Sequence, residues 1–128
     1  MRIGSHLPYP SLPQLLDMLG NDVILVGSAA RCPDSAKDYD FVISRPGLAR
    51  LLVTYGYFLC RERKGWYIFL PQEGDAPAHK PVDFFCGLHP VDDPTKLAGR
   101  ITYEEAATKP LTVSTIAGIE VLALKDDQ

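Results

Sequence analysis

Eleven prolines interrupt this chain of 128 residues, and their distribution limits what it can fold into. A proline inside a helix removes a backbone hydrogen bond and clashes with the preceding turn, and inside a central strand it breaks the ladder of hydrogen bonds. Long helices are therefore excluded, and the chain must consist of short elements joined by turns. Its length gives room for one hydrophobic core, so we expect a single domain over residues 1–128.

The spacing of apolar residues predicts a succession of short helices and strands. Leucines at helical spacing after Ser11 predict one helix, and a second is predicted between Pro46 and Gly56. Short apolar or alternating runs predict strands at residues 23–26, 38–43, 57–61, 66–70, 81–86 and 111–113. A last helix is expected after Ser114, whereas residues 101–107 fit either a short strand or a short helix. The pattern predicts an α/β (α+β) fold with a mixed sheet and flanking helices.

Composition and charge indicate a globular protein without a general attraction for polyanions. Hydrophobic residues make up 46% of the chain and charged residues 23%, as in ordinary globular domains. The net charge of -3 provides no basic field that would hold a nucleic acid, although a local basic patch remains compatible with it. No apolar run is long enough to cross a bilayer, and no signal peptide precedes the first helix. We therefore expect a cytoplasmic protein with no membrane association.

The cysteines and histidines indicate no disulfide framework and no zinc site. The cysteines are odd in number and widely spaced, at Cys32, Cys60 and Cys86. We expect reduced thiols, of which Cys60 and Cys86 are small core residues. The histidines lie in predicted loops without the spacing of metal ligands, at His6, His79 and His89. No functional role is assigned to them.

A pair of aspartates is the first sign of chemistry. Asp38 and Asp40 are two residues apart in a predicted strand, so both side chains point to one face, about 6.6 Å apart at the backbone. Neighbouring carboxylates repel each other, and a hard divalent cation such as Mg²⁺ commonly neutralises them. For an isolated pair, a strand whose aspartates face water is the simpler explanation. The metal interpretation therefore depends on the neighbouring motifs.

Two further motifs favour a site for a metal-bound phosphate. The apolar strand at residues 23–26 ends at Gly27 and Ser28, where a glycine lets the backbone approach a phosphate and the hydroxyl and following amides can donate hydrogen bonds. Asp83 lies in the apolar run at residues 81–86, where a carboxylate is costly unless it is paired, bound to metal or at the rim of the sheet. A third site carboxylate explains its position.

In this order the motifs resemble those of the nucleotidyltransferase fold, represented by DNA polymerase β and its minimal and toxin-like prokaryotic relatives. The family signature is an apolar strand, Gly-Ser or Gly-Gly, a spacer, Asp-hydrophobic-Asp-hydrophobic, and an acidic residue on a later strand. This chain has Gly27-Ser28, a spacer of nine residues, Asp38-Tyr39-Asp40-Phe41, and then Asp83. Its ending, from Val113-Ser114 through Ala123-Leu124-Lys125, is also similar to the helical segment that closes the core domain in toxin-like and uncharacterised bacterial branches.

The resemblance implies a Mg²⁺-dependent nucleotidyltransferase that uses a nucleoside triphosphate such as ATP. Asp38 and Asp40 would hold two Mg²⁺ ions, and Asp83 would complete the second ion site or accept a proton. In-line attack of a hydroxyl at the α-phosphorus would transfer a nucleoside monophosphate and release pyrophosphate. Catalysis would come chiefly from positioning and charge neutralisation.

The resemblance also assigns residues to the triphosphate. Gly27 and Ser28 would contact the β- and γ-phosphates. Arg31, in a predicted short helix after the turn, would direct its guanidinium at them, and Lys125 would approach from the last helix. A surface cation is the alternative for both basic residues.

The acceptor is left open by the resemblance, which fits an RNA, a protein or a small molecule. Larger family members continue into a helical domain that recognises the acceptor, and none is predicted here. A truncated chain, a helical partner protein and a homo-oligomer that completes the site each explain this. The alternative function is an antitoxin-like regulatory protein that acts through a partner, and a structural protein with coincidental motifs is a third. The basic run from Arg61 to Lys64 is an exposed hairpin turn or a contact for an acceptor RNA.

Overall fold

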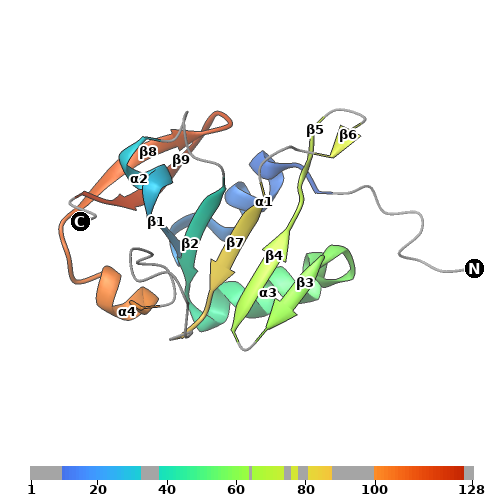
Figure 1. Ribbon diagram of the computed structural model, residues 1–128, viewed down its shortest axis with the longest axis horizontal. Helices are drawn as coiled ribbons and strands as arrows, with labels where there is room; N and C mark the ends of the chain where they lie inside the picture. The colour runs from blue at the N-terminus through green and yellow to red at the C-terminus, as the bar shows by residue number, and fades with distance from the viewer. Residues whose placement is uncertain are drawn as a thin grey trace, which may run out of the picture.

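The computed structural model describes residues 10–32, 38–63, 65–73, 76–77, 81–87 and 100–125. Its strands are β1 (Val23–Val26), β2 (Tyr39–Ile43), β3 (Arg61–Arg63), β4 (Trp66–Phe69), β5 (Gln72–Glu73), β6 (Ala76–Pro77), β7 (Val82–Phe85), β8 (Leu111–Ile116) and β9 (Ile119–Leu124). Seven of them form one mixed sheet in the order β3-β4-β7-β2-β1-β9-β8, and β5 pairs with β6 (Figure 1). The predicted α/β (α+β) class is confirmed.

The described helices are short, and three of them begin after a capping side chain. They are α1 (Leu12–Leu19), α2 (Ser28–Arg31), α3 (Arg45–Tyr55) and α4 (Tyr103–Ala106). Ser11 Oγ accepts a hydrogen bond from the amide of Gln14 at the start of α1, and Ser44 Oγ accepts one from the amide of Gly47 in α3. The predicted helices after Ser11 and Pro46 are therefore confirmed. None of the described helices is both long and apolar enough to cross a membrane.

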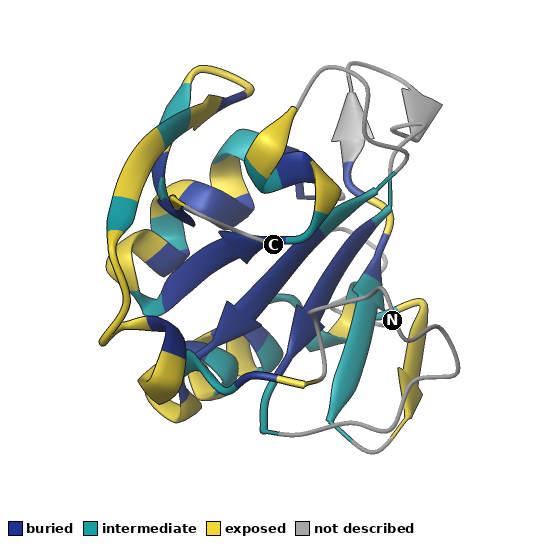
Figure 2. Ribbon diagram, turned by 60° about the vertical axis from the view of Figure 1, so that its left-hand side comes forward, coloured by how far each residue is buried: buried dark blue, intermediate teal, exposed yellow. Residues whose placement is uncertain are grey.

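Two apolar clusters pack on the two faces of the sheet. One contains the leucines of α1 together with Leu51 of α3, and the other contains Ala106 of α4. Strand β1 contributes to both, since Val23 and Leu25 lie in the first cluster and Ile24 and Val26 in the second. All residues of β1 and β7 are buried, and so are all residues of β2 except Tyr39 (Figure 2). The edge strand β3 is exposed. The centre of the sheet is thus covered on both sides, as the uniformly apolar strand at residues 23–26 predicted.

The predicted C-terminal helix is wrong, because the segment after Ser114 continues strand β8 and then forms β9. The two strands are joined at Ala117 and Gly118, which have φ angles of 52° and 82°. Positive φ at both central residues is typical of the tight turns that join antiparallel strands. Valine and isoleucine, which favour strands, occur in both segments, and β8 also contains two threonines. Lys125 therefore lies in a turn after β9, and the similarity to a closing helix is lost.

The predicted strand at residues 57–61 is also wrong. A 3₁₀ turn occupies Gly56–Phe58, and β3 begins only at Arg61. Cys60 is consequently exposed, not a core residue, whereas Cys86 is half-buried against the first apolar cluster, and burial raises the pKa of its thiol. Glu62 and Arg63 belong to β3 and not to the predicted turn, since Arg63 pairs with Trp66. At Gly65 a Cβ atom would lie 2.7 Å from the carbonyl oxygen of Cys86.

The remaining segments have mixed outcomes. Residues 101–107, which fit a strand or a helix, contain helix α4, capped by Thr102. The predicted loop after Pro71 contains the short strands β5 and β6. The three histidines lie outside the described residues.

Candidate metal centre

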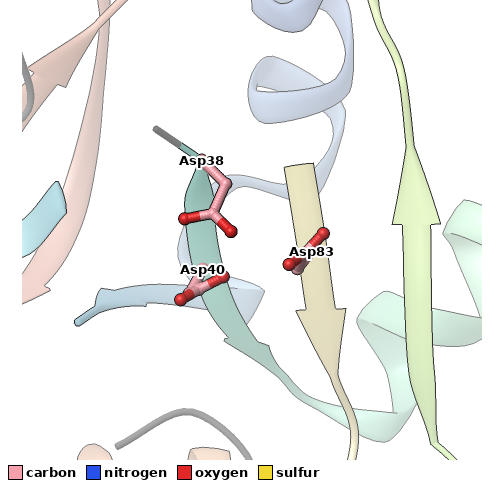
Figure 3. Close-up of side chains that lie close together, drawn as sticks. All are labelled: Asp38, Asp40 and Asp83. Atoms are coloured by element: carbon pink, nitrogen blue, oxygen red, sulfur yellow. The ribbon is translucent and has the colours of Figure 1, made fainter. Parts of the chain in front are cut away.

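Three aspartates converge where β1 ends and where β2 and β7 begin. Strand β2 pairs in parallel with β7, and this register sets Asp40 beside Asp83. Asp38 immediately precedes β2, two residues from Asp40 and on the same face. One carboxylate oxygen from each residue lies within 4.8 Å of those from the other two, and Figure 3 shows the side chains directed toward one another. The predicted convergence of the three carboxylates, called the aspartate triad below, is confirmed.

The aspartate triad lies on the sheet face that α4 covers farther along. Successive residues of a strand point to opposite faces, so Asp40 shares its face with Val42, and Asp83 shares its face with Phe85. Val42 and Phe85 belong to the second apolar cluster. The carboxylates therefore adjoin apolar side chains on the face opposite α1 and α3.

Burial makes this arrangement expensive without a counter-charge. Asp40 is 5% exposed and Asp83 is 3% exposed, while Asp38 is half-buried. The Oδ1 atoms of Asp40 and Asp83 are buried and accept no hydrogen bond, although both residues make other polar or electrostatic contacts. Two adjacent carboxylates removed from water repel each other strongly, and a bound cation offsets both the repulsion and the lost hydration.

The donor set fits a hard divalent cation. Carboxylate oxygens are the ligands that Mg²⁺ and Ca²⁺ prefer, and opposite ligand oxygens around one Mg²⁺ lie about 4.2 Å apart. A spread of up to 4.8 Å reaches that geometry through small rotations of the carboxylates. It equally suits two ions about 3.5–4 Å apart, as in two-metal phosphoryl-transfer sites. Asp38, Asp40 and Asp83 are therefore the residues that could hold the metal.

Gly27 lies directly beside the aspartate triad. Its predecessor Val26 is the register partner of Asp40, so the turn after β1 passes next to that carboxylate. Gly27 has a φ of 76°, which side chains rarely adopt, and a Cβ atom there would lie 3.3 Å from Asp40 Oδ2. Ser28 follows as an exposed residue at the start of α2. The turn thus has the position that the sequence predicts, and its contact with a phosphate stays a prediction.

The two predicted basic residues lie on elements with different outcomes. Arg31 is the exposed last residue of α2, the short helix that follows Gly27 and Ser28. Its contact with phosphates stays a prediction. Lys125 does not lie on a helix, and its amide donates a hydrogen bond to the carbonyl oxygen of Pro110. The predicted last helix is therefore wrong, whereas an approach of Lys125 to the phosphates stays a prediction.

The sequence indicated the basic run from Arg61 to Lys64 as a turn or an RNA contact, but it did not predict that two of these arginines share the face of the aspartate triad. Arg61 pairs with Ile68 across β3 and β4, and Ile68 pairs with Asp83 across β4 and β7, so all three lie on one face. Arg63 lies on the same face two residues farther along. The signal was the alternation Arg-Glu-Arg, which was assigned to a turn because the strand was predicted to end at Arg61.

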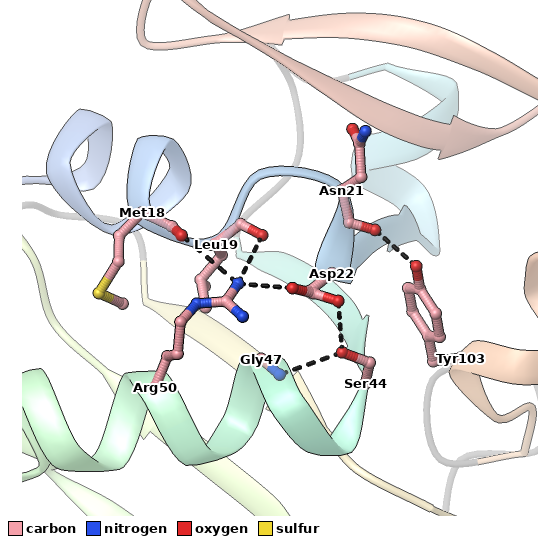
Figure 4. A network of polar contacts seen from close by, with 8 residues as sticks. All are labelled: Met18, Leu19, Asn21, Asp22, Ser44, Gly47, Arg50 and Tyr103. Atoms are coloured by element: carbon pink, nitrogen blue, oxygen red, sulfur yellow. Dashed lines mark hydrogen bonds and ion pairs between the residues drawn. The ribbon is translucent and has the colours of Figure 1, made fainter.

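A polar network fixes the opposite end of β1 and β2 (Figure 4). Ser44, which follows β2, donates a hydrogen bond from Oγ to Asp22 Oδ1 at 2.8 Å, and Arg50 of α3 forms an ion pair with Asp22 Oδ2. Arg50 also donates to the carbonyl oxygen of Leu19 at the end of α1. The hydrogen bonds from Arg50 and Ser44 lower the pKa of Asp22. This network ties α1 and α3 to the strands that carry the aspartate triad at their other end.

Comparison with protein-family models, with curated proteins and with solved structures found no match to this chain.

Proposed function

We propose that this chain is a Mg²⁺-dependent nucleotidyltransferase that moves a nucleoside monophosphate from a nucleoside triphosphate to a hydroxyl group. The observation that carries the proposal is the convergence of three carboxylates from two adjacent parallel strands beside Gly27. A carboxylate cluster alone suits many cations. The order of the motifs along the chain and the closeness of the glycine turn to the carboxylates together favour a metal-bound triphosphate.

In this proposal, different residues around the site bind the metal and the phosphates of the substrate. Asp38 and Asp40 hold Mg²⁺, and Asp83 completes the ion site or accepts the proton of the attacking hydroxyl. Bound Mg²⁺ supplies neutralisation of phosphate charge and a lower pKa of the attacking hydroxyl. The absence of a side chain at Gly27 leaves room beside Asp40 for phosphate oxygens, and the exposed hydroxyl of Ser28 donates a hydrogen bond to them.

The proposed reaction is an in-line displacement at the α-phosphorus. The acceptor oxygen forms a bond to this phosphorus while the bond to the oxygen that bridges to the β-phosphate breaks, and pyrophosphate leaves with that electron pair. The acceptor hydroxyl loses its proton to Asp83 or to solvent. Arg31, at the end of α2, contributes positive charge toward the departing phosphates.

Two measurements test the proposal. A thermal-shift screen of the four ribonucleoside triphosphates, with and without Mg²⁺, should show a rise in melting temperature that requires both components. Incubation with a triphosphate labelled at the α-phosphorus should transfer label to an acceptor in cell extract. No Mg²⁺-dependent shift with any triphosphate would overturn the proposal, whereas binding without transfer would favour the antitoxin-like regulatory alternative.

A further inference from the structure

The edge strand β3 extends the face of the aspartate triad with positive charge. Across neighbouring strands, the register sets Arg61, Ile68, Asp83 and Asp40 in one row. Both Arg61 and Arg63 are exposed. Glu62, between them, belongs to the opposite face beside Tyr67, where burial and then the charge of Glu62 raise the pKa of the tyrosine hydroxyl. The alternation therefore separates the two arginines from the strand's acidic residue.

Arg61 lies within reach of a ligand bound at the aspartate triad, and Arg63 lies in the neighbouring row, across Trp66 and Phe85. Two strand spacings separate Arg61 from Asp83 along the row, about 9–10 Å at the backbone. An extended arginine side chain covers much of that distance. The intervening residue is Ile68, which is half-buried and uncharged. An anionic molecule held at the triad can therefore extend over Ile68 and meet the guanidinium group.

The geometry of the proposed reaction decides whether the triphosphate or the acceptor lies beside β4 and β3. Gly27 follows β1, which adjoins β2 on the side away from β7, whereas Arg61 lies beyond β7 on the other side. In phosphoryl transfer the attacking and leaving oxygens lie roughly in line on opposite sides of the phosphorus. If the departing pyrophosphate lies beside Gly27, the acceptor must approach from the side of β4 and β3. The acceptor then meets two arginines.

We propose that the acceptor is a single-stranded nucleic acid whose phosphates bind Arg61 and Arg63, an inference that rests on the proposed function. Residues two apart on a strand are separated by about 6.6 Å, comparable to the spacing of successive phosphates along an extended strand. Arginine binds phosphate oxygens with paired, charge-assisted hydrogen bonds. A neutral small molecule or an uncharged protein hydroxyl would gain nothing from this pair of charges.

The test compares nucleic-acid binding by four forms of the full chain, the parent and three variants. A fluorescently labelled single-stranded RNA oligonucleotide serves as the probe, and its anisotropy is measured over a series of salt concentrations with Mg²⁺ present. The variant is Arg61→Ala with Arg63→Ala. The matched control, Arg45→Ala with Lys109→Ala, removes two exposed cations that lie outside β3. A further variant, Arg61→Lys with Arg63→Lys, keeps the charge and shows whether positive charge alone supports binding.

The alanine variant should bind the oligonucleotide roughly tenfold more weakly at low salt, while the control binds as the parent does. The slope of log affinity against log salt should fall by roughly 1.4, because each phosphate contact on a single strand contributes about 0.7. The lysine variant should keep most of the slope. Equal binding by the alanine variant and the control, or no binding by the parent, would overturn the inference in favour of a protein or small-molecule acceptor.

A separate readout distinguishes this failure from failure of the proposed function. The Mg²⁺-dependent thermal shift with a nucleoside triphosphate should be the same in the parent and in the alanine variant, because β3 lies on the acceptor side. A parent that shows this shift but binds no oligonucleotide refutes only the acceptor inference. A parent without the shift refutes the proposed function itself, together with the inference that rests on it.

Discussion

Asp40 and Asp83 lie side by side on the parallel strands β2 and β7, and they are only 5% and 3% exposed. Cross-strand neighbours in a sheet interact directly, and like charges in that position destabilise the pair. The strands could have carried apolar residues here, as they do at Val42 and Phe85 farther along the same face. A cation coordinated by both carboxylates would offset this repulsion.

Replacing Asp40 by asparagine should separate a metal ligand from an ordinary buried carboxylate. Without metal, Asp40→Asn should be as stable as the parent or slightly more so, because it removes repulsion from Asp38 and Asp83. With Mg²⁺ and triphosphate, the parent should gain about 2.7 kcal/mol at a ligand concentration one hundred times the dissociation constant. The variant should lose most of this gain, as measured by thermal unfolding with and without the ligands.

The control for this experiment is Asp17→Asn, which removes one negative charge from an exposed position on α1. It should keep the full ligand-induced gain. Equal gains in the parent and in Asp40→Asn would refute the metal-site interpretation, and so would a change of less than about 0.5 kcal/mol under every condition, as at ordinary surface sites.

Substitution of Gly27 should abolish triphosphate binding but reduce the stability of the fold only moderately. In Gly27→Val, the side chain would approach Asp40 Oδ2, since even the Cβ atom lies 3.3 Å from it. The positive φ adds backbone strain of about 1–2 kcal/mol. We expect a folded variant with a lower melting temperature and no Mg²⁺-dependent triphosphate shift.

Gly20→Val is the matched control, because Gly20 also has a positive φ, of 55°, but a Cβ atom there would meet no other atom within 4 Å. It should lose comparable stability and keep the triphosphate shift. Retained shift in a folded Gly27→Val protein would refute the proposed phosphate contact.

The sequence predicts those parts of the fold that depend on local patterns. The capped helix after Ser11 and the apolar strand that ends at Gly27 were predicted correctly because spacing, caps and turn residues lie within a few positions of one another. The C-terminal hairpin was missed because Ser114 also suits a helix start, while β9 is stabilised by parallel pairing with β1, a contact distant in sequence. Pairing of that kind leaves no local signature.

In the candidate site, too, local sequence patterns predicted some residues, whereas others depend on contacts distant in sequence. The spacing of Asp38 and Asp40 shows from sequence alone that they share a face, and the cost of a carboxylate in an apolar run indicated Asp83. The place of Arg61 on the same face was not predicted, because its strand was expected at residues 57–61, whereas β3 begins at Arg61. It depends on the exact start of β3 and on the registers of β3 with β4 and of β4 with β7.

The turn between β8 and β9 offers a stabilising substitution. Ala117 has a φ of 52° and is exposed, so Ala117→Gly relieves the strain of a left-handed residue. After the entropy cost of glycine is subtracted, the unfolding free energy should rise by about 0.5–1 kcal/mol. Ala107→Gly is the control, because Ala107 is exposed with an ordinary φ of -65° and should lose stability. Chemical denaturation of both variants measures the difference, and a loss of stability in Ala117→Gly would contradict the strained turn.

The network around Asp22 should make stability depend on pH in the acidic range. Hydrogen bonds from Arg50 and Ser44 lower the pKa of Asp22 in the folded protein below its value of 3.8 in an unperturbed chain. The contribution of the ionised carboxylate is therefore complete above the unfolded pKa and is lost as the pH falls through the folded pKa. Because Arg50 and Asp22 are partly exposed, with side chains 43% and 31% accessible, the contribution should be only about 0.5–1 kcal/mol.

Urea unfolding of the parent and of Asp22→Asn between pH 2 and 7 tests this dependence. The difference in unfolding free energy should be constant from about pH 5 upward, should shrink below about pH 4, and should approach its minimum at the lowest pH. In an Arg50→Gln background, the same substitution should show a much weaker pH dependence, because the guanidinium group whose hydrogen bond contributes most to the lowered pKa of Asp22 is gone. A difference between parent and Asp22→Asn that stays unchanged across the acidic range, or that grows as the pH falls, would show that the Asp22 carboxylate does not stabilise the junction of α1, β2 and α3 through its charge.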